Sequence, residues 1–165
     1  MITDILNIIG YLIQILIGFH LVFPLIILII YIIKRGFGAK TQAQNYDNNE
    51  ADYAIIVTAY EQTHTLPPVI DSILKINYNN YLIYIVADKC DVTNLHFESD
   101  KVIVLRPPQT LASNTRSHFY AINNFKRNHD RLTIIDSDNL VDANYLHELN
   151  IYFDAGFKAV QGERK

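Results

Sequence analysis

The sequence predicts an α/β fold with a mostly parallel sheet, preceded by one transmembrane helix. Three observations support this prediction: an almost uncharged apolar segment opens the chain, short apolar runs then alternate with helix-like segments, and several of these runs end on acidic residues. Strands that alternate with helices form β-α-β units with right-handed crossovers, and such units build parallel sheets.

The first predicted element is the transmembrane helix, in residues 1–35. The segment from Ile5 to Ile33 is almost wholly apolar, and the only charged residue before it is Asp4. A run of this length exceeds the ~20 residues needed to cross a bilayer. A cleaved signal peptide would instead begin with basic residues and carry a shorter apolar region.

Basic residues follow this helix directly, at Lys34, Arg35 and Lys40. Positive charge favours the cytoplasmic side of a membrane, so we expect a single span in the inner cell membrane with the rest of the chain in the cytoplasm. A polar linker over residues 36–52 then leads to a folded domain over residues 53–165.

Within the folded domain, five short apolar runs have the length and composition of buried strands. They are Tyr53–Thr58, Tyr81–Val86, Val102–Leu105, Leu132–Ile135 and Phe157–Val160. Helices are predicted after Thr65, from Ser113 to Asn128, and from a capping Asp142 to Gly156, where the left-handed conformation commonly ends a helix. The side chains expected to face the core from the last two helices are Phe119, Ile122, Phe125, Tyr145, Leu146, Leu149, Tyr152 and Phe153.

Composition excludes several classes of function. The net charge is −3, from 14 basic and 17 acidic residues, and no basic stripe is present, which argues against a nucleic-acid partner. The single cysteine, Cys90, excludes an internal disulfide, and no Cys/His pair has the spacing of zinc ligands. Glycine-rich dinucleotide and P-loop motifs are also absent.

The apolar run Leu132–Ile135 is followed by two acids, Asp136 and Asp138, which are the main candidates for a metal site. In an extended backbone, side chains at i and i+2 point the same way, so these two carboxylates can meet at one cation. A magnesium-like ion takes one or two carboxylates and fills its other positions with water and phosphate oxygens. Taken alone, two acids after a strand more often form a turn or a helix cap.

Two other strands also end on polar groups, and a parallel sheet gathers such strand ends along one edge. The residues concerned, besides Asp136 and Asp138, are Thr58, Tyr60, Glu61, Asp88 and Asp91. Acids can accept hydrogen bonds from a base or a ribose, an aromatic ring can stack on the base, and a metal can hold the diphosphate. Together they predict a nucleotide site.

Four motifs in this order resemble the amino-terminal half of a family 2 glycosyltransferase. They are Val57–Glu61, Ile85–Asp91, Ile135–Asn139 and Val160–Gly162. The membrane-bound cellulose-synthase-like and hyaluronan-synthase-like enzymes are similar. The resemblance implies a Rossmann-like GT-A fold, the donor-binding half of a nucleotide-diphospho-sugar transferase.

Residue by residue, the resemblance implies that Thr58, Tyr60 and Glu61 line the nucleotide pocket and that Asp88 meets the uracil. Asp136 and Asp138 would then hold Mg²⁺ or Mn²⁺ against the diphosphate of a UDP-sugar. The family usually has Pro where Thr58 stands and Asn-Glu where Glu61-Gln62 stands. Arg116 either replaces a lysine that relatives carry in this region or is a solvated helix residue.

The implied reaction is an inverting, metal-dependent sugar transfer to a carbohydrate or lipid-linked acceptor, as in polysaccharide biosynthesis. Relatives place the catalytic base and the acceptor site after the position of Lys165, so no catalytic residue is assigned here, and we expect the chain to be a fragment. The alternative is a non-catalytic, membrane-anchored nucleotide-binding or interaction module. A nucleotidyltransferase would show a glycine-rich basic loop, which Thr58–Thr65 lacks.

Overall fold

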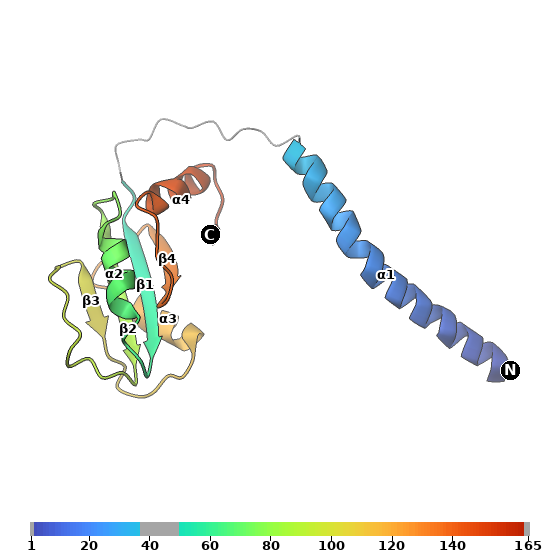
Figure 1. The fold of residues 1–165 in the computed structure, drawn as a ribbon, viewed down its shortest axis with the longest axis horizontal. Coiled ribbons are helices and arrows are strands. Elements are labelled where there is room, and N and C mark those ends of the chain that lie inside the picture. The colour runs from blue at the N-terminus through green and yellow to red at the C-terminus, as the bar shows by residue number, and fades with distance from the viewer. Residues whose placement is uncertain (1, 37–49, 164–165) are drawn as a thin grey trace. The chain divides into compact units, whose positions relative to one another are not determined.

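The structure is a computed structural model of the 165-residue chain and describes residues 2–36 and 50–163. It contains two compact units, Met1–Ala43 and Gln44–Lys165 (Figure 1). Most of the predicted linker, including Lys40, lies outside the described residues.

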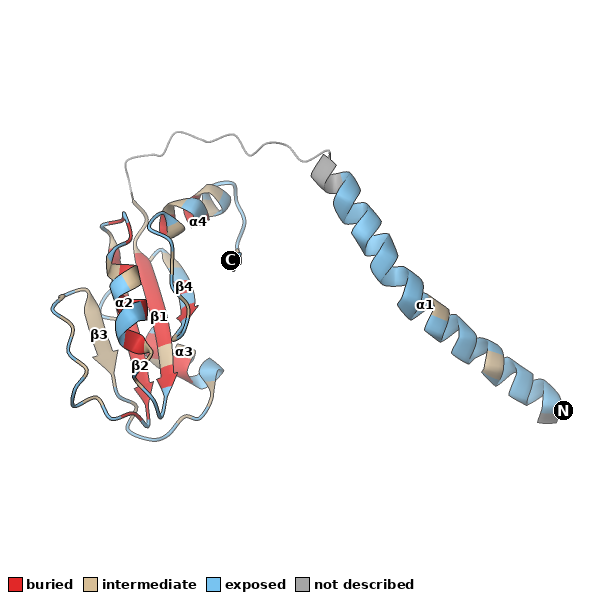
Figure 2. Ribbon diagram, viewed as in Figure 1, coloured by how far each residue is buried: buried red, intermediate tan, exposed pale blue. Residues whose placement is uncertain are grey.

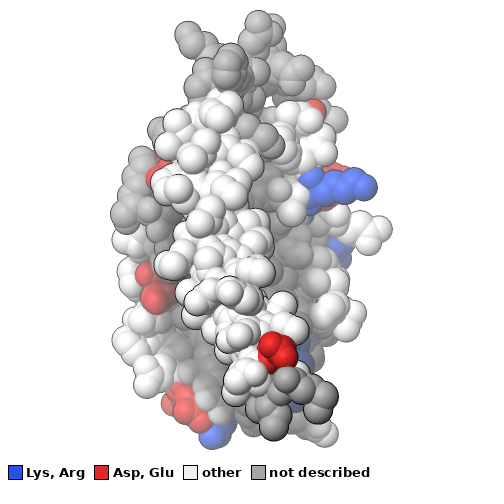
Figure 3. Space-filling view, turned by 90° about the vertical axis from the view of Figure 1, so that its right-hand side faces the viewer, with Lys and Arg blue, Asp and Glu red and all other residues white. Residues whose placement is uncertain are grey.

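The first unit contains one helix, α1 (Ile2–Gly36), with Pro24 inside it. Its segment Thr3–Ile33 is long and apolar enough to cross a membrane, and none of its most apolar part is buried by protein (Figure 2). The surface of α1 in Figure 3 is almost free of charged side chains. Exposing so much apolar surface to water is unfavourable, so α1 is suited to an apolar environment.

The second unit is built on a four-stranded sheet in the order β3-β2-β1-β4. Every neighbouring pair of strands is parallel, which confirms the predicted parallel sheet. The strands are β1 (Tyr53–Tyr60), β2 (Tyr81–Asp88), β3 (Val102–Leu105) and β4 (Arg131–Asp136). The central strands β1 and β2 are buried on both faces, as their nearly continuous apolar sequences require.

Three helices cover the sheet: α2 (Leu66–Leu74), α3 (Asn114–Asn123) and α4 (Tyr145–Asp154). Helices α2 and α4 contribute Ile70 and Leu146 to the core on one face of the sheet. On the opposite face, Ala121 of α3 packs with Ile56 and Tyr84. Figure 1 shows α2 in front of the sheet and α3 behind it.

The prediction of which α3 residues face the core is wrong for Phe119 and Ile122. Phe119 and Ile122 are 61% and 39% exposed, whereas Ser117 and Ala121 are buried. Because Ser117 and Ala121 are small, the helix backbone can approach the sheet closely. These two residues therefore face the core in place of the larger apolar side chains. The helix also ends at Asn123, before the predicted Asn128, and Phe125 packs beside Tyr84 from the loop that follows, with ring centroids 4.6 Å apart.

Two predictions around α4 need correction, and a third is confirmed. Asn144, not Asp142, is the residue before the helix, and the Asp142 carboxylate accepts the Asn144 N–H at 2.9 Å in a turn. Tyr152 is 43% exposed and does not face the core. Gly156 has φ +92°, as predicted.

The predicted strand Phe157–Val160 is absent, since no strand follows β4 within residues 50–163. A strand needs a neighbour to satisfy its backbone N–H and C=O groups, and this segment has none in the described part of the chain.

Candidate functional site

The predicted site residues meet at the carboxyl edge of the sheet. In the strand register, Tyr60 lies beside Asp88 and Thr58 lies beside Asp136. Since β2 and β4 flank β1, Asp88 and Asp136 belong to strands about 10 Å apart, within the span of one nucleotide. Ligands of open α/β sheets bind outside this edge.

These residues also share one face of the sheet. Val57, Ala59 and Ile135 belong to the core on the α2 side. Because successive side chains on a strand alternate between faces, the neighbours Thr58, Tyr60 and Asp136 project to the α3 side. Asp88 follows Ala87, which also lies on the α2 side, so Asp88 projects with them. Three strands therefore contribute to one surface.

Asp88 is the buried member of this group, with 2% exposure. Its Oδ1 accepts the backbone N–H of Leu111 at 3.0 Å, and its Oδ2 accepts that of Ala112 at 2.7 Å. The family resemblance implied that Asp88 meets the uracil, but the sequence gave no sign of these partners because they lie more than twenty residues further along the chain.

Glu61 is exposed and forms an ion pair with Lys89, whose Nζ lies 2.6 Å from Glu61 Oε1. The hydrogen bond and charge of Lys89 hold the pKa of the Glu61 carboxyl below its usual value. Glu61 N–H donates to the Asp88 carbonyl at 3.1 Å, and both Glu61 and Lys89 have positive φ. These contacts join the loops after β1 and β2. Lys89 was not among the site residues predicted from the sequence.

Asp136 ends β4 and begins a turn. Its carbonyl accepts the Asn139 N–H at 3.1 Å, and its carboxylate accepts the Asn139 amide at 3.1 Å. Asp138 is exposed within this turn. The extended-backbone argument for the pair therefore does not apply to Asp138.

The two acids still fit a hard cation chemically, since both offer exposed carboxylate oxygens near one strand end. Within residues 2–36 and 50–163, no group of three or more His, Cys, Asp or Glu side chains could hold a metal by itself. Mg²⁺ commonly takes one or two carboxylates and completes its coordination with water and substrate phosphates, which this donor set allows.

His118 is a neighbour of Asp136 that the sequence reasoning missed. Partial burial lowers the pKa of His118, while the negative charge of Asp136 acts to raise it. This interaction places one flank of α3 beside the end of β4. His118 follows the buried Ser117, and the helical rotation of 100° per residue places it at the side of the helix, a position that the sequence did not signal because the burial of Ser117 was not predicted. Arg116 is exposed in the first turn of α3.

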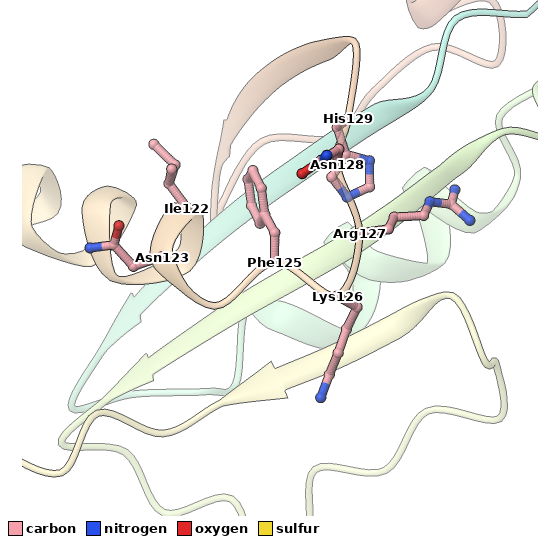
Figure 4. A pocket seen from close by; sticks show the side chains of 7 residues that line it. All are labelled: Ile122, Asn123, Phe125, Lys126, Arg127, Asn128 and His129. Carbon is pink, nitrogen blue, oxygen red and sulfur yellow. The ribbon is translucent and has the colours of Figure 1, made fainter.

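Two hollows at the surface of the folded unit are not lined by these residues. One of about 550 Å³ lies along the segment from α3 to β4 and is lined by Phe125, Arg127 and His129, among others (Figure 4). Another of about 440 Å³ lies between α2 and the loop before α4.

Comparisons with known proteins identify the family. Residues 51–165 match the profile described as "Glycosyltransferase like family 2". The match covers more than half of the chain, which therefore belongs to this family. No curated protein matches the sequence.

Similar solved structures include three of the S. aureus protein TarS. TarS 1-349 aligns with 14% identity and a TM-score of 0.55, covering 63% of this chain and 32% of that one. TarS 1-349 in complex with UDP gives 15% identity, a TM-score of 0.55 and the same coverage of both chains. A further TarS structure gives 15% identity, a TM-score of 0.54, and coverage of 63% and 20%. At these identities the likeness shows the fold alone, and the chain spans a third or less of each neighbour.

Proposed function

We propose that this chain is the donor-binding half of a membrane-anchored glycosyltransferase that transfers a sugar from a UDP-sugar to a carbohydrate or lipid-linked acceptor. The observation that carries the proposal is the gathering of Thr58, Tyr60, Asp88 and Asp136 on one face of the carboxyl edge. Membership of the family and the UDP complex of a structural neighbour support a nucleotide-sugar donor.

The uncharged helix α1 supports anchoring in the inner membrane. Lys34 and Arg35 at its carboxyl end favour a cytoplasmic folded unit. The domain division 1–35, 36–52 and 53–165 belongs to the same proposal.

The side chains at the carboxyl edge of the sheet suit different parts of a UDP-sugar. Tyr60 is 46% exposed and offers a ring face on which a base can stack. Asp136 and Asp138 would hold Mg²⁺ or Mn²⁺, which when bound supplies positive charge to the diphosphate leaving group. Inversion at the sugar requires a carboxylate base for the acceptor hydroxyl, and we place that base in a segment beyond Lys165.

Binding measurements test this proposal. The 165-residue chain in lipid nanodiscs is titrated with UDP and with several UDP-sugars, with and without Mn²⁺. We expect Mn²⁺-dependent binding that Asp138→Asn abolishes, whereas Asp142→Asn, a turn acid before α4, leaves it intact. Equal binding by wild type and Asp138→Asn would remove the metal role, and no nucleotide binding at all would refute the donor site.

Transfer is tested in the full-length gene product, whatever its length. Asp138→Asn should abolish metal-dependent transfer there. If the full-length protein binds UDP but transfers no sugar to any carbohydrate or lipid-linked acceptor tested, the chain is a non-catalytic nucleotide-binding module.

A further inference from the structure

A strained turn follows the strand that ends on Tyr60. The Gln62 N–H donates to the Tyr60 carbonyl at 2.7 Å, and Glu61 between them has φ +60°. A hydrogen bond between residues i and i+2 around a central residue of positive φ defines the rare, strained form of the γ-turn. At positive φ the Cβ of a glutamate is crowded against its own backbone, so the turn needs support from elsewhere in the chain.

Two contacts from the end of β2 support this turn. The Glu61 N–H donates to the Asp88 carbonyl at 3.1 Å, and the Glu61 carboxylate pairs with the Lys89 ammonium at 2.6 Å. Hydrogen bonding and charge from Lys89, followed by hydrogen bonding from Tyr60, lower the pKa of the Glu61 carboxyl. The carboxylate is therefore stabilised in its ionised form, in which it pairs with Lys89.

The turn lies next to two side chains proposed for the donor site. Tyr60 and Asp88 are the last residues of β1 and β2 and are paired in the strand register. Asp88 is buried, whereas Tyr60 is exposed, so the tyrosine ring is the less constrained of the two. If Glu61 relaxed towards negative φ, the chain after Tyr60 would change direction, and the ring would lose its fixed position beside Asp88.

We propose that Lys89 is a positioning residue for the base end of the donor site. Its ion pair with Glu61 holds the γ-turn after β1 and thereby keeps the Tyr60 ring beside Asp88. The effect on nucleotide binding rests on the proposed donor-binding function, whereas the support of the turn is a property of the protein alone. Lys89 acts through Glu61, without a contact of its own to the nucleotide.

Lys89→Met provides the main test, because methionine keeps an unbranched side chain and removes the charge. In the 165-residue chain in nanodiscs without nucleotide, NMR should show amide hydrogen exchange at Glu61 and Gln62 accelerated by about threefold, the size expected for an exposed ion pair. The affinity for UDP in the presence of Mn²⁺ should also fall by about threefold. Lys89→Arg keeps the charge and should retain the wild-type values of both.

The matched control is Asp154→Asn, which removes another ion pair of the folded unit. Asp154 pairs with Arg131 at 2.5 Å, and its side chain is 55% exposed, against 48% for Glu61. This pair joins the end of α4 to the amino end of β4, away from the carboxyl edge. The variant should leave UDP affinity and exchange at Glu61 and Gln62 unchanged.

A second background distinguishes support of the turn from a direct effect of the Lys89 charge on the nucleotide. Asparagine adopts positive φ more readily than glutamate and carries no charge, so Glu61→Asn keeps the turn without the ion pair. In this background Lys89→Met should cause no further loss of UDP affinity, because the turn no longer depends on Lys89. A further threefold loss would show that the ammonium acts on the nucleotide directly, and would overturn the positioning role.

The two parts of the inference fail separately. Unchanged exchange at Glu61 and Gln62 in Lys89→Met would refute the support of the turn, whether or not a nucleotide binds. Faster exchange with unchanged UDP affinity would refute the link between the turn and the base end. If the wild-type chain binds no UDP, the donor-binding proposal fails together with that link, and the exchange measurement still decides whether Lys89 holds the turn.

Discussion

Asn150 joins α4 to the sheet, and its truncation gives a quantitative test of the described packing. The side chain is 8% exposed. Its Oδ1 accepts the Tyr53 hydroxyl at 2.6 Å and also a guanidinium N–H of Arg131, and its Nδ2 donates to the Tyr78 hydroxyl at 3.2 Å. Asn150→Ala removes all of these bonds and leaves the Tyr53 hydroxyl buried without its acceptor.

The expected loss follows from these contacts. Leaving a buried hydroxyl unsatisfied costs ~1–3 kcal/mol, and each of the two further lost bonds costs ~1 kcal/mol, so we expect a decrease of about 4 kcal/mol in the free energy of unfolding. For a folded unit of this size the decrease corresponds to a fall of about 15 °C in Tm.

Urea unfolding of the 165-residue chain in detergent, followed by circular dichroism, measures this change. Asn123→Ala, an exposed amide at the end of α3, is the control and should change the unfolding free energy by less than ~0.5 kcal/mol. The double variant Tyr53→Phe/Asn150→Ala should lose less than the sum of the single losses, because the two side chains share one bond. A loss below ~1 kcal/mol in Asn150→Ala would refute the buried network.

Two further predictions concern titratable groups. Burial raises the pKa of Tyr53 to about 12, so the folded state favours the neutral form of its hydroxyl. The free energy of unfolding should therefore keep its full value below pH 10 and fall by up to about 3 kcal/mol as the pH rises from 10 towards 12. Tyr53→Phe should flatten this decline in alkaline unfolding curves, and an unchanged slope would contradict the assignment. Lys89→Met should raise the pKa of the Glu61 carboxyl towards its ordinary value in an NMR titration while Tm changes little, because the pair is exposed. A large fall in Tm would show that the pair stabilises the fold.

The sheet could be predicted from sequence because its strands are local signals. Each is a short apolar run that ends on a polar residue, and the alternation with helices requires parallel pairing. The convergence of Thr58, Asp88 and Asp136 follows from that pairing alone, since parallel strands bring their carboxyl ends together. No side-chain detail was needed for this part of the site.

What could not be predicted depends on contacts between distant segments. The burial of Asp88 depends on N–H groups from Leu111 and Ala112, whose left-handed turn has no glycine to signal it. The buried face of α3 was missed because Ser117 and Ala121 are small, and a ten-residue helix gives a weak apolar pattern.

The missing strand at Phe157–Val160 has a similar explanation. Its composition favours a strand, yet composition cannot provide the neighbour with which a strand must pair. In the described residues this segment follows Gly156 as irregular backbone.

Paramagnetic relaxation by Mn²⁺ in the presence of UDP tests the central claim most directly, because broadening of NMR signals depends on distance from the ion. With UDP present, signals of Asp136, Asp138 and His118 should broaden, while those of Arg127 and His129, beside the separate hollow, should stay sharp. Broadening that centres on His129, or that is the same without UDP, would contradict a nucleotide-diphosphate site at the carboxyl edge.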